Sequence, residues 1–298
     1  MKSEEYVIAN LPMIVEGDRL CEAVSHVAGF QPFKSQSGRE AICRIIEDKA
    51  KGNAAEMKSD YSLIPGIDKV IYVDENELAA SCFGSTEDGG YVFATFSNIE
   101  DATLLVYMDK DGKKSYFSGD YVDYLLKFAL WMAFSLASLP YKTVPLHAST
   151  ILYKDKAILF LGESGTGKST HTRLWRENIP DARMLNDDSP MVRITEQGAM
   201  AFGSPWSGKM HCYINDGFPI AACVRLSQAP ANKLIKLNIP QAFTALHPSC
   251  PPPFAYVDSL YDQISDFLSD LLSDVPVYHL EALPNADAAL LVCKTIFG

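Results

Sequence analysis

The chain has 298 residues, 48% of them hydrophobic and 21% charged, which is the composition of a folded globular protein with one large domain or two ordinary ones. Its formal net charge is −11 at pH 7. This charge argues against broad contact with DNA, RNA or an anionic membrane, because those partners need a concentrated basic surface.

The seven cysteines are scattered and include no C-x-x-C pair, a pattern that favours free thiols in a reducing compartment over disulfides or a zinc site. The amino terminus lacks the basic start and apolar run of a signal peptide. The most apolar stretch, residues 125–139, is interrupted by Lys127, Ser135 and Ser138. It is too short to span a bilayer, so we expect a buried helix and a cytoplasmic protein.

Residues 1–119 alternate short apolar runs with turn signals and predict a small, mainly antiparallel α+β domain. The runs are YVIANLPMIV, KVIYV, YVFATF and TLLVYM. DKDGK follows the last run and predicts a hairpin in which Gly112 takes a positive φ. The spacing of apolar residues in GREAICRIIEDKAKG predicts a helix that ends at Gly52.

Residues 120–143 predict a helix that connects the two domains, and residues 144–298 predict an α/β domain. LHASTILY and AILFL read as two strands, of which the second leads directly into a glycine-rich loop. Four later runs, MVRIT, AMAFG, IAACVRL and LIKLN, also read as strands. SLYDQISDFLSDLLSD and NADAALLVCKTIF read as helices.

The glycine-rich loop GESGTGKS satisfies the pattern G-x-x-x-x-G-K-[ST], which predicts a site for the phosphates of a nucleotide. Its glycines let backbone N–H groups turn toward the phosphates, the lysine adds a positive charge, and the serine hydroxyl can ligate Mg²⁺. THTRLWREN, which follows, can form a helix whose positive end faces the same place. The residues expected to bind the nucleotide are Gly162, Glu163, Ser164, Gly165, Thr166, Gly167, Lys168, Ser169 and Thr170.

A pair of carboxylates, Asp187 and Asp188, follows the apolar stretch of ARMLNDDSP. If this stretch lies beside AILFL in the sheet, both segments end at the same sheet edge, where ligands of open α/β sheets bind. Adjacent residues of a strand point to opposite sides, so one aspartate would hold metal and the other would act as general base. The alternative is a turn with a side-chain cap, since Asn, Asp, Ser and Pro all favour turns.

His147, in LHAS, has two open interpretations. It is a satisfied core histidine, or it reaches the aspartates and the terminal phosphate from a neighbouring strand.

Taken in order, LHAS, GESGTGKST, LNDD and GSPWSGK resemble the catalytic domain of the HPr serine kinase/phosphorylase family, and more closely the bacterial HPr kinase-related proteins. The resemblance covers residues 144 to about 230 and implies a P-loop kinase domain of the HPr kinase/phosphoenolpyruvate carboxykinase type that uses ATP and Mg²⁺. On the matching positions it implies that Asp187 is the acid/base and that Asp188 assists with the metal. It further implies that His147 supports them and that Lys209, in a flexible loop with Trp206, neutralises the transferring phosphate.

Two departures from the family pattern matter. Thr170 stands where bifunctional HPr kinases carry glutamate, and the family's glycine-rich signature before the C-terminal helices is not recognisable. The resemblance therefore does not imply HPr as the substrate, phosphorolysis, or a particular oligomer. Arg173 and Arg176 read as surface charges. Arg225, at the end of IAACVRL, could face the active-site edge, although a surface arginine at a strand end is the preferred interpretation.

The resulting prediction is a kinase that moves the γ-phosphate of ATP to a hydroxyl of a protein, a peptide or a small molecule. One alternative is a phosphoenolpyruvate carboxykinase-like enzyme, because that enzyme shares the loop and an aspartate pair. Another is a non-catalytic ATP-binding regulatory module. ATP is preferred to GTP here on the resemblance, and no N-K-x-D guanine signature is present.

Overall fold

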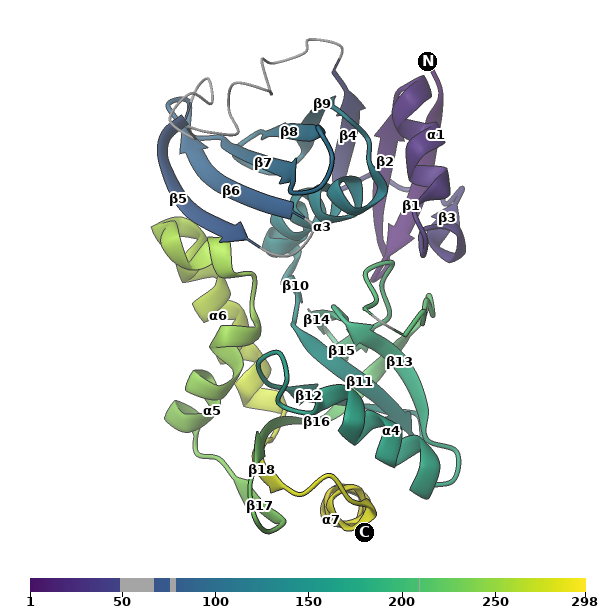
Figure 1. Ribbon diagram of the computed structural model, residues 1–298, viewed down its shortest axis with the longest axis vertical. Coiled ribbons are helices and arrows are strands. Elements are labelled where there is room, and N and C mark those ends of the chain that lie inside the picture. Colours follow the sequence, from purple (N-terminus) through teal and green to yellow (C-terminus); the bar gives the residue numbers. More distant parts are fainter. Residues whose placement is uncertain (49–66, 76–78, 209) are drawn as a thin grey trace. The chain divides into compact units, whose positions relative to one another are not determined.

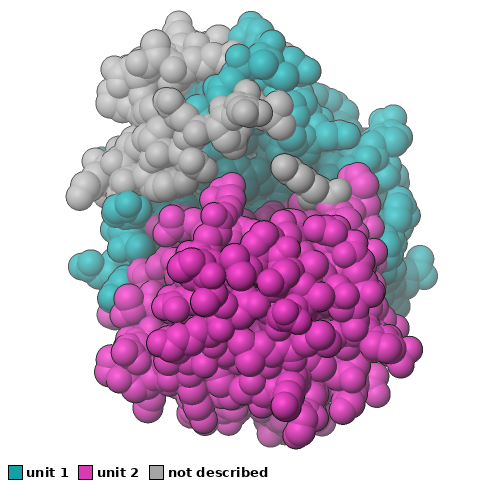
Figure 2. All heavy atoms as spheres, turned by 60° about the horizontal axis from the view of Figure 1, so that its bottom comes forward, with its two compact units in different colours: residues 1–140, 253–261 teal, residues 141–252, 262–298 magenta. Residues whose placement is uncertain are grey.

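The computed structural model of the chain describes residues 1–48, 67–75, 79–208 and 210–298. These residues form two compact units, each with its own mixed β-sheet. Unit 1 contains residues 1–140 and 253–261, and unit 2 contains residues 141–252 and 262–298, coloured teal and magenta in Figure 2. The α/β character expected of the second half of the chain is confirmed.

Unit 1 is built on one sheet in which nine strands are described, in the order β3-β1-β2-β4-β9-β8-β7-β6-β5 (Figure 1). The strands are β1 (Ser3–Ile8), β2 (Leu11–Glu16), β3 (Lys34–Ser35), β4 (Cys43–Glu47), β5 (Ile67–Glu75), β6 (Ala79–Thr86), β7 (Tyr91–Ser97), β8 (Thr103–Met108) and β9 (Lys114–Gly119). The predicted hairpin is confirmed: β8 and β9 pair antiparallel, and Gly112 in the turn has φ 66°. A short helix, α1 (Asp18–His26), packs against β2 and β4.

Helix α3 (Asp123–Ser138) packs against β7 and β8 and belongs to unit 1. Most of its residues from Leu125 onward are buried, as expected of the apolar stretch. The helix is thus part of the hydrophobic layer over the sheet of unit 1. That residues 120–143 connect two domains stays a prediction. Across the described ranges, none of the helices combines the length and the apolarity needed to cross a membrane.

The helix predicted over residues 38–52 is wrong where the structure describes that segment, up to residue 48. Residues Cys43–Glu47 form β4, which pairs in parallel with β2 on one side and β9 on the other. Along it Cys43 and Ile45 are buried whereas Arg44 is exposed, which is the alternation of a strand. The β-branched Ile45 and Ile46 favour this conformation, and pairing on both sides outweighs the apparent helical spacing.

Unit 2 holds the second sheet, whose main path runs β10-β14-β15-β16-β12-β11-β13, with β18 also paired to β16 and β17 paired to β18. The strands are β10 (Thr143–Pro145), β11 (Ala148–Tyr153), β12 (Lys156–Leu161), β13 (Arg183–Asp188), β14 (Met191–Thr195), β15 (Gly198–Phe202), β16 (Gly217–Gln228), β17 (Lys233–Lys236) and β18 (Val277–Ala282). The helices are α4 (Lys168–Asn178), α5 (Ile239–Leu246), α7 (Ala286–Phe297) and α6 (Asp258–Asp274), of which α6 contributes residues to both units.

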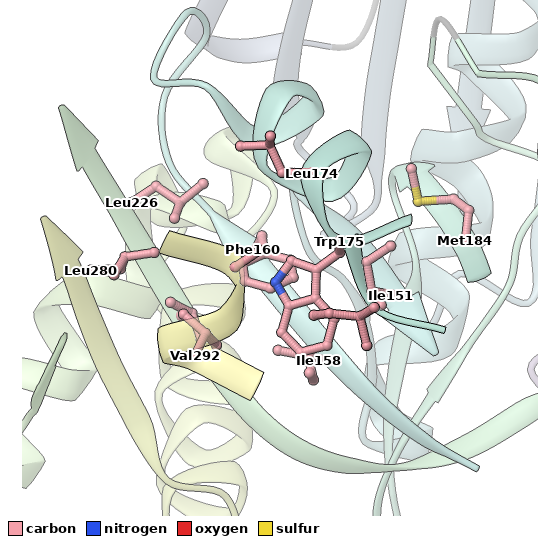
Figure 3. Close-up of a cluster of buried hydrophobic side chains, with 12 residues drawn as sticks. Ile151, Ile158, Phe160, Leu174, Trp175, Met184, Leu226, Leu280 and Val292 are labelled. Atoms are coloured by element: carbon pink, nitrogen blue, oxygen red, sulfur yellow. The ribbon is translucent and has the colours of Figure 1, made fainter. Parts of the chain in front are cut away.

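The core beside the glycine-rich loop is centred on Trp175 of α4, which is fully buried (Figure 3). Its ring lies near Phe160 of β12, with ring centroids 5.8 Å apart. Val292 of α7 and Leu280 of β18 belong to the same cluster. Burying such side chains contributes about 1.5–3 kcal/mol each, so α4 is held firmly against the sheet.

The prediction that ARMLNDD lies directly beside AILFL in the sheet is wrong. β13 pairs with β11, and β11 lies between β13 and β12, so ARMLNDD does not lie directly beside AILFL. Both pairings are antiparallel, so β12 and β13 run in the same direction and their carboxyl ends reach the same sheet edge. The expected meeting of the loop and the aspartates at one edge therefore holds, and the first residues of β11 lie between them.

Candidate phosphate-binding and carboxylate site

The glycine-rich loop joins the end of β12 to the start of α4, in the strand–loop–helix order that the sequence predicted. Gly165 and Gly167 have φ of 82° and 103°, a region that residues with a Cβ adopt only at a cost. Gly162 has φ 151°, and a Cβ there would lie 2.5 Å from Thr166 Oγ1. The pattern's glycines are thus required by the backbone path that opens the loop toward the first turn of α4.

Lys168, at the first position of α4, points its ammonium group back into the loop. Its Nζ donates to the carbonyl oxygens of Gly162 and Glu163, at 2.6 and 3.2 Å. Burial lowers the pKa of Lys168, and the nearby Asp188 and Asp187 oppose that shift. A half-buried ammonium over a loop of this shape is a ready ligand for phosphate oxygens.

His147 precedes β11 and lies between the loop lysine and one aspartate. Its Nε2 is 3.0 Å from Lys168 Nζ, and its Nδ1 is 3.3 Å from Asp188 Oδ1. The side chain is 48% exposed, and its backbone N–H donates to Ser249 O at 2.7 Å. Of the two interpretations left open by the sequence, the structure favours the one in which His147 faces the site, because a core histidine would be enclosed.

Asp187 is 5% exposed, and both of its carboxylate oxygens accept hydrogen bonds from protein groups. Oδ1 accepts from Ser149 Oγ at 2.9 Å, and Oδ2 accepts from the backbone N–H of Met210 at 3.1 Å. The donors come from β11 and from the segment after β15. Asp187 therefore ties that segment to the sheet.

Asp188 has different surroundings, as the alternation of a strand predicts. Its side chain is 47% exposed and lies beside His147. Asn186, which precedes the pair, is fully buried and accepts the backbone N–H groups of Asp188 and Ser189 at 3.1 and 2.9 Å. The Asn-Asp-Asp-Ser stretch thus combines the predicted turn chemistry with a carboxylate that solvent and ligand can reach.

Residues 203–208, from the GSPWSGK segment, run along the end of β13. Ser207 forms an isolated antiparallel bridge with Asp188, and the backbone N–H of Gly208 donates to Asp187 O at 2.9 Å. A Cβ at Gly208 would lie 2.7 Å from that same oxygen, so the close approach requires glycine. Trp206 is 3% exposed and anchors the segment. Lys209, predicted to neutralise the transferring phosphate, lies outside the described residues.

Arg225 lies beside the glycine-rich loop, which is the less preferred of the two positions that the sequence left open for it. It lies near the end of β16, in register with Leu161, the residue that precedes the loop. Its Nη1 donates to Ala245 O at 3.1 Å, and its Nη2 lies 3.5 Å from Glu163 Oε1. The parallel pairing of β16 with β12 was the missing information. By contrast, Arg173 forms an exposed ion pair with Glu177 at 3.0 Å, as a surface charge would.

Some residues of this site carry oxygen atoms that could bind Mg²⁺. Within the described ranges, no cluster of three or more His, Cys, Asp or Glu side chains is arranged to hold a metal ion. Mg²⁺ does not need such a cage, because it commonly takes one or two carboxylates together with phosphate oxygens and water. The exposed Ser169 and the half-exposed Asp188 offer the hydroxyl and carboxylate oxygens for that mode.

Comparison with known proteins yields no match, either among protein-family models or among curated proteins. The chemistry of the site itself is therefore the basis for a functional assignment.

Proposed function

We propose that unit 2 is an ATP-dependent phosphotransferase that moves the γ-phosphate to a hydroxyl, on serine or threonine of a protein or peptide or on a small molecule. The observation that carries this proposal is the chain of contacts from Lys168 through His147 to Asp188 at one sheet edge. A cation from the phosphate loop and an accessible carboxylate are the two groups that phosphoryl transfer needs side by side.

The loop would bind the triphosphate through its backbone N–H groups and through Lys168. In the structure the ammonium is bonded to two loop carbonyls. On binding, phosphate oxygens would replace these neutral acceptors, which is favourable because the ammonium then faces anionic oxygens and gains their charge attraction. The first turn of α4 adds its unpaired N–H groups to the same position.

Transfer breaks the bond between the γ-phosphorus and the β–γ bridging oxygen, whose electron pair stays on ADP. A new bond forms between that phosphorus and the acceptor oxygen, and the acceptor's hydroxyl proton passes to a carboxylate. The family resemblance implies that Asp187 takes this proton. We propose that Asp188 is better placed to take it, because Asp187 is buried and each of its oxygens already accepts a hydrogen bond from a protein group.

Asp187 would then act as a positioning residue. It holds Met210 and the end of the 203–208 segment close to Asp188 through its own hydrogen bonds. His147 would orient the Asp188 carboxylate through Nδ1 and would lie near the terminal phosphate through the neighbouring Lys168. When bound, Mg²⁺ supplies positive charge that offsets the charge of the β- and γ-phosphates. Ser169 is the residue that would hold it, together with phosphate oxygens and water, because Asp188 is assigned to the proton.

The test is a transfer assay with γ-³²P-ATP, Mg²⁺, a library of serine and threonine peptides and a panel of small alcohols. Asp188→Asn should abolish labelling of the acceptor and leave ATP affinity within about twofold, since a neutral amide cannot take the proton. Asp181→Asn, an exposed change just before β13, is the matched control and should retain full activity.

Asp187→Asn separates the two assignments. If Asp188 takes the proton, Asp187→Asn should slow transfer without abolishing it. Complete loss in Asp187→Asn with activity retained in Asp188→Asn would instead support Asp187 as the base. Production of phosphoenolpyruvate from oxaloacetate without transfer to any hydroxyl would overturn the kinase proposal.

A further inference from the structure

A cavity of about 380 Å³ opens beside the glycine-rich loop, away from the two aspartates. Its walls come from the loop, from one face of α4, and from the segments at the ends of β16 and β18. The lining includes His171 and Leu174 of α4, Leu226 and Gln228 of β16, Ala229 and Leu283. The volume lies within the range of small-molecule sites, roughly 300–1,000 Å³.

The order of the strands places this cavity and the carboxylates on opposite sides of the loop. β16 pairs with β12 in parallel, and β18 pairs with β16 in parallel, so all three strands end at the loop's edge of the sheet. β11 and β13 lie on the other side of β12. The loop is therefore flanked by His147 and Asp188 on one side and by the cavity on the other.

The described residues that line the cavity include no acidic side chain and no lysine or arginine. Leu174, Leu226 and Leu283 supply apolar surface. His171 lines the cavity as well, and burial lowers its pKa to about 4, so its ring is neutral at pH 7. Away from the loop itself, such a lining is unsuited to a phosphate and suited to an uncharged group.

Two side chains add neutral hydrogen-bonding groups to this lining. Trp175 Nε1 donates to His171 Nε2 at 3.2 Å, so the neutral ring carries its hydrogen on Nδ1 and keeps one donor. Gln228 Nε2 donates to Gly165 O in the loop at 3.1 Å, which leaves its Oε1 as an acceptor. Apolar walls with a few neutral donors and acceptors are the usual setting for a heterocyclic base.

We propose that this cavity binds the nucleoside half of the substrate, its base and ribose, while the loop binds the phosphates. The nucleotide would lie across the loop, with its uncharged end against α4 and the ends of β16 and β18. Its terminal phosphate would point toward His147 and Asp188. This inference rests on the proposed function for the position of the phosphates, and the lining of the cavity supports it independently.

The experiment compares the full-length protein with Ala229→Trp, which would fill the cavity from a partly exposed position at its rim. Ala231→Trp is the matched control, because Ala231 is exposed two residues further along and is not part of the lining. Calorimetry measures binding of Mg²⁺-ATP, Mg²⁺-tripolyphosphate and adenosine. Ala229→Trp should weaken ATP at least about tenfold and leave tripolyphosphate within about twofold, whereas Ala231→Trp should change neither.

The three probes separate this inference from the proposed function. One outcome is that Ala229→Trp binds ATP as tightly as the unchanged chain, while Lys168→Ala loses both ATP and tripolyphosphate. The cavity is then not the nucleoside site, although the loop still binds the phosphates. A second outcome is that adenosine binding is lost only in Ala229→Trp, while tripolyphosphate does not bind at all. The cavity then binds the nucleoside, but the loop is not a phosphate site. Circular dichroism of both tryptophan variants checks that each has folded.

Discussion

His147 Nδ1 lies 3.3 Å from Asp188 Oδ1 at the sheet edge where β11 begins and β13 ends. The two residues are brought together by the antiparallel pairing of β11 with β13, in which Ala148 is the partner of Asp188. The same histidine also contacts Lys168, at the start of α4. The side chain of His147 thus connects β13 with the glycine-rich loop. Its replacement should lower the rate of phosphate transfer more than the affinity for ATP.

His147→Gln should lower the rate of phosphate transfer about 10- to 100-fold, because Asp188 loses the group that orients it. The affinity for ATP should change by less than about threefold, since the loop backbone and Lys168 remain. The control is His211→Gln, an exposed histidine that contacts Tyr213. Steady-state kinetics with the best acceptor from the library measure both effects. An unchanged rate in His147→Gln would show that His147 has no role in transfer.

Gly208→Ala should displace the backbone of residues 203–208 and so disturb the site. The new Cβ would meet Asp187 O at 2.7 Å and Asp188 Cβ at 3.3 Å, so residues 203–208 would have to move away from β13. We expect a loss of about 1–3 kcal/mol in the free energy of unfolding and a larger relative loss of transfer. Chemical denaturation and the transfer assay measure the two quantities. A fully active and fully stable variant would show that the segment does not need this close approach.

Arg225→Gln should weaken binding of the phosphates. The guanidinium lies beside the loop and contacts Glu163 and Ala245 O, and its charge is one cause of the lowered pKa of Lys168. We expect ATP and tripolyphosphate to lose about 1–2 kcal/mol of binding free energy each, with adenosine unaffected. Arg173→Gln, on the exposed face of α4, is the control. Equal losses in both variants would indicate only a general electrostatic effect.

The stability of unit 2 should fall in mild acid because of His171. Burial lowers its pKa to about 4, whereas an unfolded histidine titrates near 6.5. Between these values the unfolded chain binds more protons, so this contribution is full above about pH 6.5 and is lost as the pH falls toward 4. At pH 5 the loss should be about 2 kcal/mol.

The measurement is urea denaturation at pH 7.5 and pH 5. His171→Gln keeps an acceptor for Trp175 but cannot titrate, so it should lose about 2 kcal/mol less than the unchanged chain over this interval. His211→Gln should keep the full pH dependence. If all three proteins lose the same stability, the buried histidine is not the titrating group.

The local parts of the site could be predicted from the sequence, because they depend on residue type at fixed spacing. Gly162, Gly165 and Gly167 permit the loop's backbone path, and the strand before it and the helix after it follow from local patterns. The alternation along β13 likewise predicted different surroundings for Asp187 and Asp188.

The parts that depend on pairing between distant strands could not be predicted. Nothing in ARMLNDD specifies β11 as its neighbour, so the position of His147 between the loop and Asp188 was only one of two interpretations. The burial of Asp187 depends on Ser149 and Met210, which are far apart in the chain. The position of Arg225 at the loop was the less preferred of two interpretations for the same reason, and β4 was predicted as a helix because its parallel partners were unknown.

The most direct test of the central claim is transfer of ³²P from γ-labelled ATP to a hydroxyl acceptor by the full-length protein, compared with Asp188→Asn at equal ATP occupancy. The account predicts a phosphoserine, phosphothreonine or phosphorylated alcohol with the unchanged protein. It predicts none with Asp188→Asn, although that variant still binds the nucleotide. Transfer at an undiminished rate by Asp188→Asn would contradict it.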